Sequence, residues 1–166
     1  MIYRFGHQAV VRLAGNVFAD EADVRKPDRD RESPMAADSS RQKIHKVVLV
    51  GHCGADQFML QRAVSQALGD VVSVTSVNDW DTLVAGGGPG SLMLVNRVLD
   101  GRFGTGSGVE LIGRLCGQPD PPVTVLVSNF EDAQEQAVGV GALRGFGKSD
   151  LNTPTVAGLL KQMVFG

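Results

Sequence analysis

Aromatic side chains, excess positive charge, paired cysteines and long apolar runs are all scarce in this sequence. Phe, Trp and Tyr make up 5% of the 166 residues, and the formal net charge is −2. Without stacking side chains or a basic surface, the chain is not expected to bind nucleic acid. Two cysteines, Cys53 and Cys116, make no disulfide framework, which favours a reducing, cytoplasmic location. No apolar run approaches the roughly 20 residues that a membrane span requires, so no membrane association is predicted.

The residues that are present divide the chain near position 43. Residues 21–43 are charged, contain Ser and Pro, and have almost no large apolar side chains. Such a segment cannot bury enough surface to offset the entropy lost on ordering. We therefore predict an N-terminal extension over 1–43, mostly disordered, with at most one short element in 1–20. A single domain is predicted for residues 44–166.

Short apolar strands alternate with helices from Ile44 onward. The expected strands are 47–50, 71–77, 91–95, 123–127 and 143–146, and the expected helices are 55–68, 78–85, 108–116, 131–138 and 154–164. In the first helix, apolar residues from Met59 to Leu68 follow the helical period. Alternation of this kind predicts the α/β class, with a doubly wound, five-stranded parallel sheet of flavodoxin-like (βα)5 type.

Polar residues stand just past four of the five strands. They are Gly51-His52 after the first, Asn96 after the third, Ser128 after the fourth and Lys148 after the fifth. In open α/β sheets the carboxyl ends of the strands line the crevice in which ligands bind. We therefore expect these five residues to lie around one pocket.

Three stretches in this order resemble the receiver domain of two-component response regulators. They are VVLVGHCGADQFMLQRAV, SLMLVNRVLDG with SGVELIGRL, and PPVTVLVSNFEDAQEQAVGVGALRGFGK. The resemblance covers residues 44–164 and implies the (βα)5 receiver fold. It also implies a phosphoacceptor Asp at position 96, Mg²⁺-binding acids at 51 and 52, a hydroxyl at 128, a lysine at 148 and a switching aromatic at 145.

The sequence departs from that pattern at the acids. Asn96 replaces the phosphoacceptor, and an amide cannot become an acyl phosphate. Gly51 offers no ligand, and a His52 nitrogen is a poor match for Mg²⁺, which prefers oxygen. Only Ser128 and Lys148 match. The resemblance is therefore to a degenerate receiver, or pseudo-receiver, which is not an enzyme and needs no metal or cofactor.

Each of these residues also has a purely structural interpretation. Asn96 either makes turn bonds to its own backbone or keeps the pocket neutral. Lys148, deprived of the acids with which it would pair, is expected to extend along the surface. Ser128 could cap the helix that follows it, and His52 is expected to be structural or superficial, with pH response as the alternative.

Two acids and a thiol near these strand ends are further candidate site residues. Asp56 is expected to interact with the positive end of a helix dipole. Asp100, in an Asp-Gly turn, is expected to lie too far outside the strand end to replace the missing phosphoacceptor. Cys53 is expected to be buried and inert.

Two functions of different class follow. The leading hypothesis is a phosphorylation-independent signalling and protein-interaction module. Its surface would be Glu131–Val164 and its partner a kinase, a regulator or a second copy of the chain. The alternative is a small flavodoxin-like enzyme or nucleotide-binding domain that uses the Gly51–Gly54 and Asn96–Gly108 loops. A ligand in the carboxyl-end crevice would favour the alternative.

Overall fold

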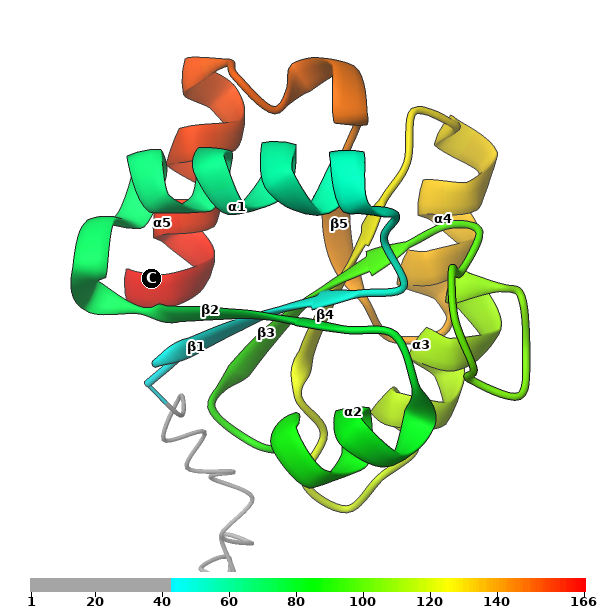
Figure 1. Cartoon of the computed structure of the whole chain (residues 1–166). Helices are drawn as coiled ribbons and strands as arrows, with labels where there is room; N and C mark the ends of the chain where they lie inside the picture. Colours follow the sequence, from blue (N-terminus) through cyan, green and yellow to red (C-terminus); the bar gives the residue numbers. More distant parts are fainter. Residues whose placement is uncertain (1–42) are drawn as a thin grey trace, which may run out of the picture. The chain divides into compact units, whose positions relative to one another are not determined.

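A computed structural model describes residues 43–166, which form one parallel sheet covered by helices on both faces (Figure 1). The spatial order of the strands is β2-β1-β3-β4-β5. Their bounds are Lys46–Val50 for β1, Ser73–Val77 for β2, Ser91–Asn96 for β3, Val123–Val127 for β4 and Leu143–Phe146 for β5. All four strand pairs are parallel. The predicted doubly wound sheet is confirmed.

The helices form two layers. They are α1 at Gly54–Leu68, α2 at Trp80–Gly86, α3 at Gly108–Cys116, α4 at Glu131–Gly139 and α5 at Pro154–Phe165, with 3₁₀ turns at Gly69–Val71 and Lys148–Asp150. Helices α1 and α5 cover one face of the sheet, and α2, α3 and α4 cover the other (Figure 1). Alternate residues of each strand enter opposite cores, so Leu94 packs with α1 and α5 whereas Val95 packs with α2 to α4.

Strand β3 is buried along its whole length because it has a neighbour on each side and helices over both faces. Strand β1 pairs with both β2 and β3, in line from Lys46 to Val50. The chain therefore winds outward in both directions from β1 and β3. Their carboxyl ends form the switch point at which open α/β sheets bind ligands.

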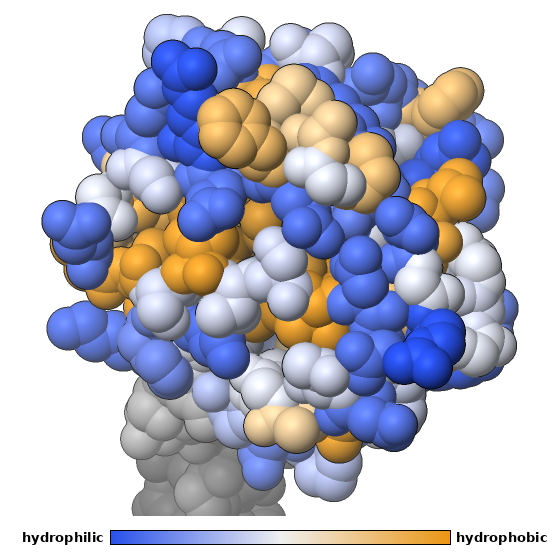
Figure 2. Space-filling model, viewed as in Figure 1, coloured by the Kyte–Doolittle hydropathy of each residue, from blue (hydrophilic) through white to orange (hydrophobic). Residues whose placement is uncertain are grey.

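Two local expectations were wrong. The helix expected over 78–85 begins at Trp80, and its N-cap is Asp79, which accepts a hydrogen bond from Thr82 N at 2.9 Å. Met59 is 46% exposed because it lies beside, and not on, the buried stripe of α1. Phe58, next to it, is 68% exposed, and Figure 2 shows apolar side chains gathered over α1 among hydrophilic ones.

The predicted extension over 1–43 and its short element in 1–20 lie outside the described residues, apart from Lys43. Within residues 43–166, none of the helices has the length and apolar character needed to cross a membrane.

Candidate functional site

Asn96, the last residue of β3, is fixed by two backbone carbonyls. It is 8% exposed, and its Nδ2 donates to Gly51 O at 2.9 Å and to Val98 O at 2.6 Å. These bonds tie the end of β3 to the turn after β1. Both amide hydrogens are used, so the atom that Asn96 leaves for the pocket is Oδ1, a hydrogen-bond acceptor. Of the two roles weighed from the sequence, the turn bonds are what the structure shows.

An acid at the first position of the turn after β1 would be strained and would displace the Leu99 side chain. Gly51 has a φ of 67°, in the left-handed region, and a Cβ there would lie 2.6 Å from Leu99 Cδ2. Its N–H donates to Val77 O at 3.0 Å, and its carbonyl also accepts from Asp100 N at 2.9 Å. Asp100 itself is exposed. The glycine is therefore required by the backbone path.

His52 is fully buried, which decides between the structural and superficial interpretations. Its Nε2 lies 2.9 Å from Leu94 O, so this nitrogen carries the proton and donates it. Nδ1 is buried and has no hydrogen-bond partner among the described residues. Burial, reinforced by the nearby Lys148 charge, lowers the pKa of His52 from 6.5 to about 4. At neutral pH the ring is an uncharged part of the core beneath the pocket.

Lys148 has a partner that was not anticipated. Its Nζ donates to Asp56 Oδ2 at 2.5 Å, and the two side chains are 31% and 18% exposed. The hydrogen bond from Lys148 lowers the pKa of Asp56 below its ordinary value. The expectation that Lys148 would extend unpaired along the surface was wrong, because an acid from the first turn of α1 takes the place of the acids missing after the strands.

Ser128 closes the turn after β4. Its Oγ accepts from Phe130 N at 3.1 Å, and the N-cap of α4 is Phe130. The Ser128 hydroxyl therefore fixes the backbone where α4 begins, which is close to the capping role expected for it. Of the five predicted residues, Asn96, Ser128 and Lys148 line a cavity of about 160 Å³ together with their neighbours, whereas Gly51 and His52 do not line it.

The side chain of Gln134 lies beside Gly145, which has no side chain of its own. Gln134 of α4 is 4% exposed, and its Nε2 lies 3.1 Å from Leu126 O, 3.0 Å from Ser128 O and 3.3 Å from Phe146 O. Its Oε1 accepts from Gly145 N at 3.1 Å. A Cβ on Gly145 would lie 1.9 Å from Leu126 O. The Gln134 amide bonds to β4 and β5 where the pairing of these two strands is interrupted. In this arrangement no aromatic side chain can occupy position 145.

The predicted pocket residues and the nearby Asp56 do not fit Mg²⁺. Gly51 has no side chain, His52 is buried with Nε2 engaged, and Asn96 supplies one neutral oxygen. Asp56 is occupied by Lys148. Across residues 43–166, no group of three or more His, Cys, Asp or Glu residues is arranged to hold a metal ion. The donor set gives Mg²⁺ neither the charge nor the oxygens that it prefers.

The Gly-rich loop from Asn96 to Gly108 is closed on itself. Leu99 N donates to Gly106 O at 3.0 Å, Gly108 N donates to Arg97 O at 2.9 Å, and Val98 forms an antiparallel bridge with Ser107. Phe103, at its centre, is 2% exposed. Since these amides are already bonded, they do not form the ring of free N–H groups that cradles a nucleotide phosphate.

Arg97 and Phe130 line the cavity without having been predicted from the sequence, and Cys53, outside the cavity, was predicted wrongly. Arg97 lies over the Phe130 ring, with Cζ 4.5 Å from its centroid, and both residues line the cavity. Arg97 directly follows Asn96, so its position after β3 was the available signal. Cys53 was expected to be buried but is exposed, because as N-cap of α1 it stands outside the helix's buried stripe.

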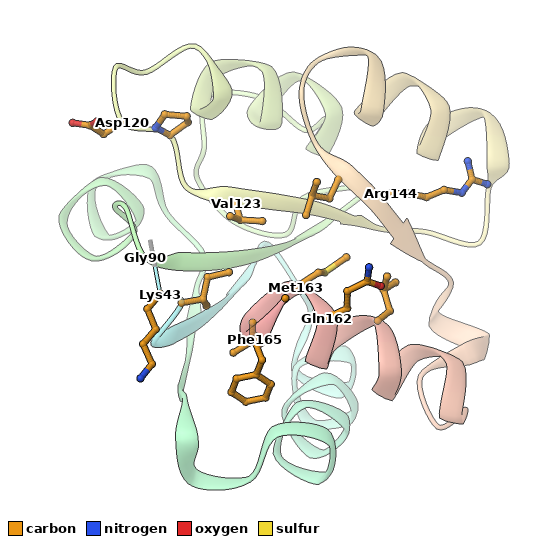
Figure 3. A pocket seen from close by; sticks show the side chains of 14 residues that line it. Lys43, Gly90, Asp120, Val123, Arg144, Gln162, Met163 and Phe165 are labelled. Carbon is orange, nitrogen blue, oxygen red and sulfur yellow. The ribbon is translucent and has the colours of Figure 1, made fainter. Parts of the chain in front are cut away.

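A second hollow lies at the opposite edge of the sheet. It has a volume of about 1340 Å³ and is lined by residues that precede or open the strands, together with the end of α5. Figure 3 shows Val123 and Met163 facing it from β4 and α5, with the charged ends of Lys43, Asp120 and Arg144 at its edges. Arg144 is paired with Glu131. This hollow holds none of the predicted site residues.

The structure is similar to solved structures of response-regulator receiver domains. The signal receiver domain of a DNA binding response regulator from Colwellia psychrerythraea 34H is similar, with a TM-score of 0.59, 15% identity, and coverage of 74% of this chain and 99% of that one. A response regulator receiver domain from Rhodospirillum rubrum gives a TM-score of 0.51 and 14% identity, with coverage of 72% and 92%. The phosphorylated cyanobacterial phytochrome response regulator RcpA gives 0.50 and 18%, with coverage of 72% and 91%.

These likenesses show the fold. No family model matches the chain, and no curated protein matches it either. The described part of the chain therefore has the receiver fold.

Proposed function

We propose that this chain is a signalling and protein-interaction module with a receiver fold that acts without phosphorylation of its pocket. The observation that carries the proposal is Asn96, which stands in the phosphoacceptor position with both amide hydrogens bonded to Gly51 O and Val98 O. No carboxylate is available there to take a phosphoryl group. Lys148, the group that would neutralise the transferred charge, is bonded to Asp56 instead.

The link from the pocket to the α4–β5 surface also differs from that of a switching receiver. The resemblance places a movable aromatic at position 145, where this chain has glycine. Gln134 joins α4 to β4 and β5 through four polar contacts within 3.3 Å. Such a buried, fully bonded amide favours one arrangement of α4 and β5. We infer that this surface is presented constantly.

The partner surface in this proposal is Glu131–Val164, with its centre where α4 passes into β5. Val138, Val140 and Leu143 are 43%, 41% and 48% exposed there. The exposed acids of the adjoining helix are Glu131, Asp132 and Glu135. An apolar centre beside acidic side chains suits a protein partner with an apolar contact and basic neighbours. A kinase, a regulator or a second copy remain the candidates.

Affinity capture with the full chain tests this surface. Leu143→Asp places a charge at its centre, and Val71→Asp is the matched control because Val71 is 61% exposed on the 3₁₀ turn after α1. We expect Leu143→Asp to lose a protein that the native chain and Val71→Asp both retain, with or without acetyl phosphate. Equal loss from both variants, or retention only after acetyl phosphate treatment, would contradict the proposal.

The nucleotide-binding alternative finds no support in these contacts. Gly51 N donates to Val77 O, and in the Asn96–Gly108 loop the N–H groups of Leu99, Asp100, Arg102 and Gly108 donate to other backbone carbonyls.

A further inference from the structure

The cavity at the carboxyl ends is also lined by side chains that the proposed function does not use. Its lining consists of Asn96, Arg97, Val98, Val127, Ser128, Asn129, Phe130 and Lys148. The only charged residues among these eight are two cations. A volume of about 160 Å³ holds several water molecules, or the end of one acidic side chain.

Both cations have hydrogen-bonding capacity to spare. Arg97 forms no ion pair with any of the described residues, and its guanidinium is held over the Phe130 ring by a cation–π contact. Lys148 gives one of its three ammonium hydrogens to Asp56. An oxyanion in the cavity would therefore find a guanidinium with free N–H groups and a partly free ammonium, without breaking the Lys148–Asp56 bond.

The rim of the cavity is apolar. Val98 and Phe130 are each 56% exposed. Apolar side chains exposed to water contribute no hydrophobic stabilisation to the fold. Neither is on a loose segment: Val98 is bridged to Ser107, and Phe130 N is bonded to Ser128 Oγ. A bare ion would leave this rim uncovered. An acidic side chain flanked by apolar residues would cover it.

We propose that Arg97, Val98, Phe130 and Lys148 form a docking site for an acidic segment of a protein partner. Its Glu or Asp side chain enters the cavity between the two cations, and its apolar neighbours lie on Val98 and Phe130. The partner thereby supplies the carboxylate that the pocket lacks at position 96. The site shares Lys148 with the range Glu131–Val164, but its other three residues lie outside that range, and it does not depend on the α4–β5 surface being an interface.

Two short peptides provide the probe for ¹⁵N NMR titration of the full chain. Acetyl-Leu-Glu-Leu-amide carries the charge and apolar flanks, and acetyl-Leu-Gln-Leu-amide differs only in the charge. We expect the Glu peptide to shift the amides of 96–98, 128–130 and 148. It should bind at least tenfold more tightly than the Gln peptide, as a charge-assisted hydrogen bond contributes roughly ten- to hundredfold. Inorganic phosphate should bind more weakly than the Glu peptide.

Arg97→Gln is the decisive variant, because Arg97 is exposed and its removal leaves no buried charge. It should weaken the Glu peptide about tenfold, whereas Arg62→Gln, on the exposed face of α1, should leave it unchanged. Equal binding of the two peptides, equal effects of the two variants, or phosphate binding as tight as the Glu peptide would each overturn the docking site. An acyl phosphate on the chain would instead contradict the proposed function and leave this result intact.

Discussion

Asn96→Asp, the change that restores the receiver acid, should destabilise this chain. It replaces an amide NH₂ that donates to Gly51 O and Val98 O with a carboxylate oxygen that faces the same carbonyls, 2.9 and 2.6 Å away. Two hydrogen bonds become acceptor–acceptor contacts in a site that is 8% exposed. Gly51 O keeps its bond from Asp100 N, so the loss is mainly at Val98 O. We expect a cost of about 2–4 kcal/mol at neutral pH.

The cost should depend on pH in a defined direction. Burial and two carbonyl oxygens raise the pKa of the introduced carboxyl in the folded chain. Its protonated form can donate one of the two lost bonds. The deficit relative to the native chain should therefore be smallest below the unfolded pKa of about 3.9. It should grow as pH rises and level off above the folded pKa.

Urea denaturation of both chains across this pH range measures the effect. Asn129→Asp is the matched control, because Asn129 is exposed and uses Oδ1 to accept from Ser149 N at 3.2 Å. A carboxylate preserves that bond, so the control should change stability by less than about 0.5 kcal/mol. If Asn96→Asp were as stable as Asn129→Asp at neutral pH, the assigned orientation of the Asn96 amide would be refuted.

Three further changes test other contacts of the site. The native chain should lose up to roughly 3 kcal/mol of stability as pH falls from 6.5 to about 4, because the folded pKa of His52 is depressed and the unfolded state binds the proton first. Thermal denaturation should show that the stability of His52→Phe depends less on pH over this range. An unchanged pH dependence would contradict the assignment. A double-mutant cycle with Asp56→Asn and Lys148→Met should give a coupling of about 1–3 kcal/mol, whereas zero coupling would show that the pair of 2.5 Å does not persist in solution. Gln134→Leu should cost about 2–4 kcal/mol and speed hydrogen exchange at Gly145, with the exposed Gln136→Leu as control; equal effects would mean that the Gln134 amide does not hold the β4–β5 ladder.

The fold followed from the sequence because its signals are local. Leu92-Met93-Leu94-Val95 has no polar face, so the sequence favoured a strand whose two faces are both buried under helices. The alternation of strands and helices then left few topologies. Met59 was misjudged because a helix is assigned from its period, and Met59 is apolar without lying on the stripe that Leu60 and Val64 define.

The location of the site could be predicted from the sequence, but its hydrogen bonds and its ion pair could not. Strand ends brought Asn96, Ser128 and Lys148 to one edge of the sheet, as expected. The Lys148–Asp56 pair joins residues 92 positions apart, and it depends on where the first turn of α1 lies relative to β5. Gln134 resembles any polar residue of a helix until its position over the gap at Gly145 is known. Neither contact has a signature in the local sequence.

The proposed function requires that the pocket cannot accept a phosphoryl group. Intact-mass spectrometry of the full chain after incubation with acetyl phosphate and Mg²⁺ tests this most directly, with ¹H–¹⁵N spectra recorded in parallel. We predict no phosphorylated species and no change in the amides of Ser128, Gly145 or Lys148. A stoichiometric phosphoryl adduct, at Asp100 or at any other carboxylate of the carboxyl-end edge, would contradict the claim.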